Sequence, residues 1–305
     1  MKRLEVRAPA KINLYLDVLR KRADGYHNIK SLLLPLALYD QLVLEQGPGA
    51  IEVLTQNPTR FRGIPWPISM GSLENNLAGR AAHLLKTMTG YRRGARIFLK
   101  KNIPIAGGMG GGSADAAAVL VGLNRLWDTG LTQKELMAIG ARLGCDIPAL
   151  VHGGALEMNG RGERIRPLRL GRKRLWFLLI NPGFGISTGD IYTRYTEDLT
   201  SPAPPARFAS ILRGLEEGSL ELIAAGLFNA LQKTVFQKYP LLKLMHKELA
   251  QLKAKGVLLS GTGPTLFALV STRAQGYELA ARVRAALGCP LWMRVIPAGA
   301  AAAEA

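Results

Sequence analysis

The stretch Asn102-Ile-Pro-Ile-Ala-Gly-Gly-Met-Gly-Gly-Gly-Ser113 carries five glycines in the six positions 107–112. Glycine loses more backbone freedom on ordering than any other residue, so this run predicts a loop and neither a helix nor a strand. Residues 95–100 before it favour a strand, and the alanine- and leucine-rich segment 113–127 after it predicts a helix with Ser113 as its N-cap. The sequence therefore predicts a strand, a glycine-rich loop and a helix in direct succession.

A unit of this kind is suited to bind an anion. Backbone N–H groups without side chains can surround the anion, and the helix adds four unpaired donors and the positive end of its dipole. A Walker loop would end in Gly-Lys-Ser/Thr, whereas this loop ends in Gly-Gly-Ser-Ala, and a Rossmann turn would be shorter. A flexible surface loop is the alternative, which the direct junction with a helix disfavours. We therefore predict a triphosphate-binding loop at residues 104–114.

The N-terminal segment 3–56 is expected to form strands, because apolar and more polar side chains alternate over residues 12–18. In a strand, Lys11 and Asn13 project from the same face. A cation and an amide then stand together where an apolar pair would be expected. They belong either to a site or to a solvated strand face, and the residues alone leave both open.

Two further segments carry candidate site residues. In Leu143-Gly-Cys-Asp-Ile-Pro148, Asp146 is expected at the C-terminal end of a helix that Pro148 prevents from continuing. A carboxylate is unfavourable at the negative end of a helix dipole, which indicates a functional role, with an ordinary turn aspartate as the alternative. Gly261-Thr-Gly-Pro264 lies between two expected strands and forms either a tight turn or a second backbone wall of the site.

The composition bounds the class of protein. The 305 residues suffice for two domains, and 48% hydrophobic with 20% charged residues indicates a globular chain. A formal charge of +18 favours anionic partners, but the basic residues form short clusters without a stripe of interleaved aromatics. Cys145 and Cys289 suggest neither a disulfide framework nor a metal cluster. Without an apolar signal or spanning segment, the chain is expected in the cytoplasm.

The segments 9–14, 104–114 and 259–267, in this order, resemble the three motifs of the GHMP family of small-molecule kinases. The resemblance runs over residues 9–267. It implies an α/β (α+β type) fold of two domains with the active-site cleft between them. An N-terminal ATP-binding domain would span residues 1–160, and a C-terminal substrate domain would span 161–305, with the final strand packing back on the first domain. Ala114 replaces a serine common in the family, and activity is expected to survive because the backbone cradle does not need that hydroxyl.

Further motifs narrow the resemblance to members whose acceptor alcohol carries a cytidine diphosphate. They are Asp24-Gly-Tyr-His27, Glu74-Asn-Asn-Leu77, Leu143–Pro148, Gly160-Arg-Gly-Glu163 and Ser187-Thr-Gly-Asp-Ile-Tyr192. The resemblance implies that Asp146 is the general base and that Lys11 stabilises charge. Its implied substrate-binding residues are Asn13, Tyr26, His27, Tyr192 and Gly263. Tyr26 and Tyr192 would hold the cytosine ring between them.

The resemblance also implies ATP as the phosphoryl donor, with Mg²⁺ carried mainly by the phosphates and no protein metal ligand identified. The implied ATP-binding residues are Pro104, Ala106, Gly107, Gly108, Gly110, Gly111, Gly112 and Ser113, with Asn76, Leu77 and Lys101 at the adenine. No nucleic acid or membrane partner is implied, and the oligomeric state is left open.

Two other functions are compatible with these observations. Another kinase of the same family, acting on homoserine, mevalonate or a sugar, would share the loop but would give no reason for Tyr26, His27 and Tyr192. A basic RNA-binding protein with a similar strand–helix module would instead bind RNA in a salt-sensitive manner and would not hydrolyse ATP.

Overall fold

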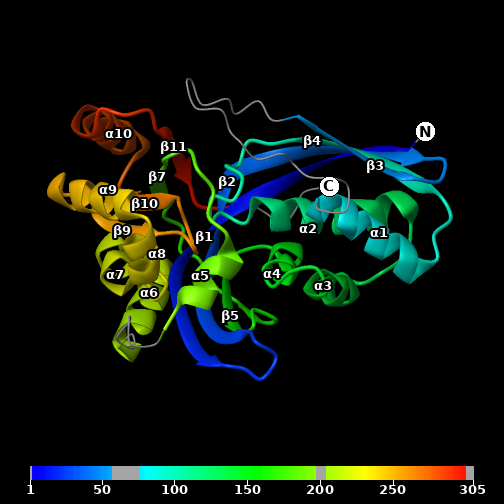
Figure 1. Cartoon of the computed structure of the whole chain (residues 1–305), viewed down its shortest axis with the longest axis horizontal. Coiled ribbons are helices and arrows are strands. Elements are labelled where there is room, and N and C mark those ends of the chain that lie inside the picture. Colours follow the sequence, from blue (N-terminus) through cyan, green and yellow to red (C-terminus); the bar gives the residue numbers. More distant parts are fainter. Residues whose placement is uncertain (1, 57–75, 197–203, 300–305) are drawn as a thin grey trace.

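The computed structural model describes residues 2–56, 76–196 and 204–299, which form two β-sheets with helices packed against them (Figure 1). The strands are β1 Arg3–Lys21, β2 His27–Gly47, β3 Ile51–Gln56, β4 Gly94–Lys100, β5 Leu156–Gly160, β6 Arg164–Pro167, β7 Trp176–Asn181, β8 Phe228–Asn229, β9 Lys255–Leu259, β10 Leu266–Val270 and β11 Trp292–Pro297. The helices are α1 Leu77–Thr89, α2 Gly111–Trp127, α3 Gln133–Ala141, α4 Ile147–His152, α5 Thr188–Arg194, α6 Pro205–Glu217, α7 Leu220–Gly226, α8 Gln232–Lys238, α9 Pro240–Gln251 and α10 Arg273–Leu287.

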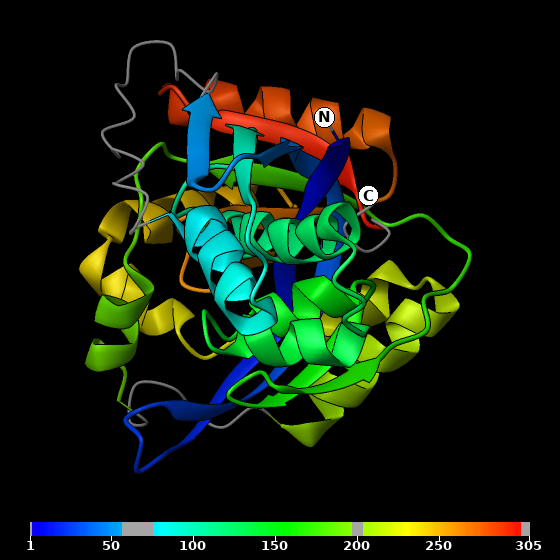
Figure 2. The same cartoon turned by 90° about the vertical axis from the view of Figure 1, so that its right-hand side faces the viewer.

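The first sheet has the order β3-β4-β2-β1-β8, with β5 and β6 added at β2, and the second has the order β11-β7-β10-β9. Helices α1 and α2 pack side by side over the first sheet, and α10 lies along β7 and β11 of the second (Figure 2). In the described part of the chain, no helix is both long and apolar enough to cross a membrane.

Strand β1 is antiparallel to β2, and its register shifts between Pro9 and Lys11 and again between Asn13 and Tyr15. Such bulges bend a strand and re-aim its side chains, and they are frequent beside active sites. Lys11 and Asn13 lie between the two shifts, and their side chains contact each other as the strand period predicted. The half-buried alternation expected over residues 12–18 was wrong for 12–16, because Asn13 and Tyr15 are buried as well as Ile12 and Leu14.

One hydrophobic core contains side chains from both sheets. Ile12 of β1 and Leu34 of β2 lie in the same buried cluster as Phe177 of β7, Ile211 of α6 and Phe267 of β10. Strands β6 and β8 lie beyond residue 160 but pair with the first sheet. Strand β11 pairs with β7 in the second sheet, and a bridge joins Leu36 to Ala298. The division of the chain at residue 160 therefore stays a prediction.

The helix after the glycine-rich loop begins earlier than expected. Helix α2 starts at Gly111, with Gly110 as its N-cap in the left-handed conformation at a φ of 67°. Ser113 is therefore in the first turn, and its prediction as the N-cap was wrong. Each glycine in a helix costs about 1 kcal/mol relative to alanine. Most of the later helix is buried, and this packing offsets the cost because tertiary contacts supply most helical stability.

Asp146 lies at the start of a helix, whereas the sequence had placed it at the end of one. Helix α3 ends at Ala141, and α4 begins at Ile147 with Pro148 in its first turn. Proline is well tolerated there because a first-turn N–H has no intrahelical partner. The Asp146 side chain makes no capping hydrogen bond to α4, which leaves it available to other groups. A capping box formed by Thr132 and Glu135 stands at the start of α3.

Candidate active site

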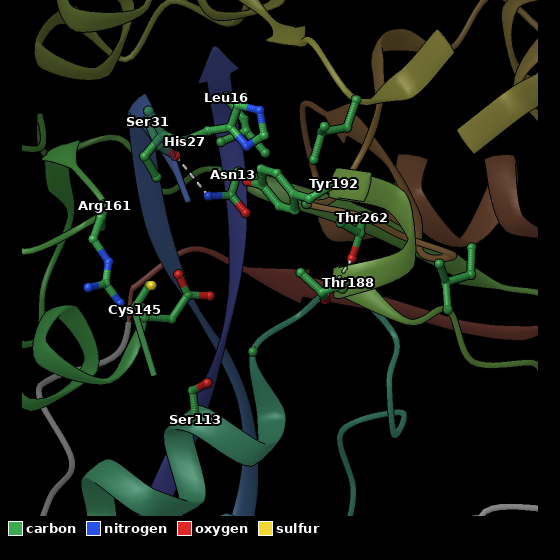
Figure 3. Close-up of a pocket in the computed structure, with 18 of the residues that line it drawn as sticks. Asn13, Leu16, His27, Ser31, Ser113, Cys145, Arg161, Thr188, Tyr192 and Thr262 are labelled. Atoms are coloured by element: carbon green, nitrogen blue, oxygen red, sulfur yellow. Dashed lines mark hydrogen bonds between the residues drawn. The ribbon is translucent and has the colours of Figure 1, made fainter. Parts of the chain in front are cut away.

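A cavity of about 780 Å³ lies where β1, β2, the glycine-rich loop, α5 and the turn at 261–262 meet (Figure 3). It gathers most of the residues that the sequence predicted for the site. The predicted residues in its lining are Lys11, Asn13, Tyr26, His27, Leu77, Ala106, Gly107, Gly108, Gly110, Gly111, Gly112, Ser113, Asp146 and Tyr192.

The Lys11 ammonium joins two of these side chains. Its Nζ lies 3.0 Å from Asp146 Oδ2 and 2.7 Å from Asn13 Oδ1. The Lys11 side chain is buried, whereas about a third (31%) of the Asp146 side chain is exposed. The cavity therefore presents a carboxylate that can accept a proton, directly beside a fixed cation.

The carbonyl groups of the glycine-rich loop are occupied by other parts of the chain. Four successive carbonyl oxygens accept hydrogen bonds: Ala106 O from Ile186 N at 3.2 Å, Gly107 O from Thr265 N at 3.2 Å, Gly108 O from Ser260 Oγ at 2.9 Å and Met109 O from Lys11 N at 3.0 Å. The N–H groups of residues 110–113 have no acceptor among the residues described here. The loop and the start of α2 thus offer several free donors to an anion.

Two positions explain why the loop needs glycine. Gly108 and Gly110 have φ angles of 77° and 67°, a left-handed conformation that other residues rarely adopt. A Cβ atom at Gly108 would lie 2.2 Å from the carbonyl oxygen of Ser260, and one at Gly110 would lie 2.9 Å from Lys11 Cε. The loop therefore sits close against both the 260–263 turn and the Lys11 side chain.

Four predicted residues lie outside the cavity lining: Asn76, Lys101, Pro104 and Gly263. Asn76 is the N-cap of α1, where its side chain accepts a hydrogen bond from the N–H of Ala78 at 2.9 Å. The residues Glu74 and Asn75 of the same motif fall outside the described part of the chain. Leu77, next to Asn76, does line the cavity, on the side of α1.

Lys101 is buried under the loop, whereas the sequence had placed it at the adenine. Its ammonium is paired with the carboxylate of Asp40 and also contacts the carboxyl group of Asp115. Asp40 also accepts hydrogen bonds from the N–H groups of Asn102 and Ile103. Burial raises the pKa of Asp115, although the Lys101 ammonium opposes this shift. No sequence motif indicates this cluster, because its members come from three separate segments.

The aromatic residues form two small groups at the cavity. The rings of His27 and Tyr192 are 5.8 Å apart, tilted by 33°. The guanidinium carbon of Arg161 lies 3.9 Å from the centre of the Tyr26 ring, so Arg161 covers one face of this half-exposed tyrosine. Burial raises the pKa of the Tyr192 hydroxyl further above its ordinary value. Both tyrosines line the cavity.

Several lining residues were not predicted, among them Ser31, Cys145, Arg161, Thr188 and Thr262. The hydroxyls of Thr188 and Thr262 lie 3.1 Å apart and join α5 to the 261–262 turn. Arg161 and Thr188 stand inside motifs that the sequence had singled out, so a signal for them existed. Ser31 had none, because a serine in an apolar strand has no distinctive spacing.

Two family models and several known kinases are similar to this chain. The family model "GHMP kinases N terminal domain" matches residues 76–154, and "GHMP kinases C terminal" matches residues 211–289. A 4-diphosphocytidyl-2-C-methyl-D-erythritol kinase of Alkaliphilus oremlandii is 36% identical over 269 residues, which is 88% of each chain. One of Symbiobacterium thermophilum is 37% identical over 92% of this chain and 95% of its own.

A solved kinase structure is also similar to this chain. The crystal structure of a 4-(cytidine 5'-diphospho)-2C-methyl-D-erythritol kinase aligns with a TM-score of 0.76 at 33% sequence identity. The alignment covers 97% of this chain and 100% of that chain. The similarity therefore extends over both sheets and the cavity between them.

Proposed function

The chain belongs to the GHMP kinase family and is an ATP-dependent small-molecule kinase. We propose that it phosphorylates a hydroxyl of 4-diphosphocytidyl-2-C-methyl-D-erythritol, in the non-mevalonate route to isoprenoid precursors. The family resemblance and the α/β fold class predicted from the motifs are confirmed. The acceptor is inferred from relatives that share more than a third of this sequence over most of its length.

The pairing of Lys11 with Asp146 beside the glycine-rich loop is the observation that carries the proposal. An acceptor alcohol must lose its proton as it attacks the γ-phosphoryl group, and Asp146 is the carboxylate in place to receive it. A positioned general base typically contributes about 10²–10⁴-fold. The transition state of phosphoryl transfer is loose, so we expect positioning and charge stabilisation by Lys11 to contribute more than the base.

The triphosphate would lie on the free N–H groups at the start of α2, with the adenine towards Leu77. Mg²⁺ bound with the nucleotide would neutralise phosphate charge. Among the described residues, no three His, Cys, Asp or Glu side chains lie close enough together to hold a metal ion. The Ser113 hydroxyl and the Asp146 carboxylate, which both line the cavity, are available to such an ion, and the nucleotide would supply most of its ligands.

The cytidine end of the acceptor would bind between Tyr26 and the pair formed by His27 and Tyr192. Stacking of a base on an aromatic ring is worth roughly 1–3 kcal/mol. Arg161 covers one face of Tyr26 in the structure, so the base would use its other face or displace the guanidinium. Asn13 would position a hydroxyl or phosphate oxygen of the acceptor near Asp146.

A coupled assay of ADP release with a panel of acceptors tests the proposal. The panel contains 4-diphosphocytidyl-2-C-methyl-D-erythritol, homoserine, mevalonate and galactose, each with ATP and Mg²⁺. We expect turnover with the cytidine compound alone. Turnover with another alcohol in its place would assign the chain to a different acceptor. Binding of RNA that weakens steeply with salt, without ADP release from any acceptor, would favour the RNA-binding alternative.

A further inference from the structure

A buried hydroxyl lies directly behind the proposed catalytic pair. Ser31 of β2 has no exposed surface, and its Oγ lies 2.8 Å from Asn13 Nδ2 and 2.8 Å from the carbonyl oxygen of Tyr15. Figure 3 shows the bond between Ser31 and Asn13 at the back of the cavity. Asn13 in turn contacts Lys11. A continuous chain of hydrogen bonds thus leads from the backbone of β1 to the Lys11 ammonium.

Chemistry fixes the direction of every bond in this chain. A backbone carbonyl only accepts, so the Ser31 hydroxyl donates its one proton to Tyr15 O. The lone pairs of Ser31 Oγ then face Asn13, and only the amide nitrogen can donate to them. The amide oxygen of Asn13 must consequently face Lys11, whose Nζ donates to it at 2.7 Å.

The strand geometry brings these groups together. The register of β1 on β2 shifts between Asn13 and Tyr15, beside the position of Ser31. The terminal torsion of an asparagine amide has only a broad preference of its own, so neighbouring groups must set its rotation. The Ser31 hydroxyl supplies that constraint.

We propose that Ser31 is a positioning residue, which holds the Asn13 amide oxygen against Lys11 and so fixes the ammonium beside Asp146. Without the hydroxyl, the Asn13 NH₂ group loses its acceptor, and only the contact with Lys11 still holds the amide. The amide oxygen, and with it the ammonium, would then be held less firmly in the site. The inference rests on the proposed function, because Lys11 and Asp146 act in the transfer only if the chain phosphorylates an alcohol.

The test compares Ser31→Ala, Ser31→Thr and Asn13→Ala with the double variant of Ser31→Ala and Asn13→Ala. We expect Ser31→Ala to lower kcat about tenfold, the effect of one hydrogen bond of roughly 1.4 kcal/mol, with the KM for ATP changed less than about twofold. Ser31→Thr keeps the hydroxyl and should restore most of the rate. In the Asn13→Ala background, Ser31→Ala should not lower kcat further, because Ser31 acts through Asn13.

A matched control is Ser210→Ala, because the Ser210 hydroxyl also donates to a carbonyl, that of Leu222, at 2.8 Å but away from the cavity. It should leave kcat unchanged. A wild-type kcat in Ser31→Ala, or an equal loss with and without Asn13, would overturn the proposal.

The wild-type rate with the cytidine acceptor depends on the proposed function alone. If that rate is absent, a double-mutant cycle in urea unfolding still decides the role of Ser31. If the substitutions at Asn13 and Ser31 have coupled effects on the free energy of unfolding, the proposal that Ser31 holds Asn13 is supported. If their effects are independent, the proposal is overturned.

Discussion

Lys11 carries a charge that the protein buries almost completely, since only 5% of the residue is exposed. A buried ammonium is costly unless it is paired and hydrogen-bonded. Asn13 Oδ1 and Asp146 Oδ2 supply the partners, and the cradle glycine Gly110 packs against its methylene groups. The cation is thereby held in one place between the loop and the carboxylate.

We expect Asp146→Asn to lower the single-turnover rate by about 10²–10⁴-fold, because the amide cannot take the acceptor's proton. ATP affinity should change little, since the nucleotide cradle is made by backbone groups. Rapid-quench kinetics and calorimetric titration with a non-hydrolysable ATP analogue measure the two effects. Glu221→Gln, which breaks an exposed ion pair with Lys255, is the control. A rate loss below tenfold would make Asp146 a structural residue.

We expect Tyr26→Ala and Tyr192→Ala each to raise the KM for the cytidine acceptor, by about 5- to 150-fold, while the KM for ATP stays nearly constant. The reason is the loss of a stacking face worth roughly 1–3 kcal/mol. Steady-state kinetics with each substrate varied in turn provides the measurement. Tyr277→Ala is the control, because Tyr277 is as exposed as Tyr26 but lies on α10. If neither variant shifts the acceptor KM, the cytidine assignment fails.

At the scale of elements, the glycine-rich loop is held by backbone contacts from both halves of the chain. Ile186 and Thr265 donate to its carbonyls from one side, and Lys11 donates from the other. These bonds fix the orientation of the peptide planes before any nucleotide arrives. The free N–H groups are therefore pre-organised for an anion, which avoids part of the entropy loss on binding.

Gly108→Ala should weaken nucleotide binding and destabilise the fold, because the new Cβ would lie 2.2 Å from Ser260 O and would disfavour the φ of 77°. We expect the left-handed backbone of an alanine to lower the free energy of unfolding by about 1–2 kcal/mol and the overpacking to lower it by about 1–3 kcal/mol. Gly90→Ala is a matched control, since Gly90 has a φ of 67° with nothing within 4 Å of the added Cβ. Gly90→Ala should lose stability through the backbone strain but should bind the ATP analogue with unchanged affinity. Equal affinities in both variants would contradict the close contact of the loop with the 260–263 turn.

The buried cluster of Asp40, Lys101 and Asp115 should respond unequally to neutralisation of its two carboxylates. Asp40 accepts the Lys101 ammonium and two backbone N–H groups, so Asp40→Asn should cost about 3–5 kcal/mol. Burial raises the pKa of Asp115 to about 8, so its carboxyl resembles a neutral amide near pH 7. Asp115→Asn should therefore cost much less.

The same cluster predicts a pH effect with a defined sign. A raised pKa in the folded state stabilises the protein at low pH, and this contribution is lost as the pH rises from about 4, the unfolded value, towards about 8. Between pH 5 and pH 8, the free energy of unfolding of the wild type should fall relative to that of Asp115→Asn. Urea unfolding at the two pH values measures this difference. A pH-independent difference between the two proteins would contradict this reading of Asp115.

Local signals predicted the elements well, and long-range contacts were the part that the sequence did not reveal. The strand period placed Lys11 and Asn13 on one face, and the glycine run predicted the loop. The start of α2 was missed because tertiary packing outweighed glycine's low helix propensity. Lys101 was misplaced because its partner Asp40 is 61 residues away. Ser31 was missed because its role depends on a side-chain contact with Asn13 of the neighbouring strand.

At the scale of the whole molecule, the two sheets share a core. Side chains from β1 and β2, including Leu14 and Leu32, pack in one cluster with Phe208, Leu258 and Trp292 from the second half. Strand β8, from the second half, pairs with β1 beside Tyr15 and Leu16. The cavity therefore lies on a continuous packed interior to which both halves of the chain contribute.

We expect the fragment 1–160 not to fold alone, because it would expose the β1 and β2 side chains that pack against the second sheet and would lack β6 and β8. Burial of one large apolar side chain contributes about 1.5–3 kcal/mol, and a domain has only about 5–15 kcal/mol of net stability. Losing the cover of Ile12, Leu14, Leu32 and Leu34 would remove about 6–12 kcal/mol, which is comparable to that whole margin. Circular dichroism and urea unfolding of fragments 1–160 and 161–305 provide the measurement, with the full chain unfolding in one transition as the reference. A cooperative transition in the isolated 1–160 fragment would instead establish two autonomous domains divided near residue 160.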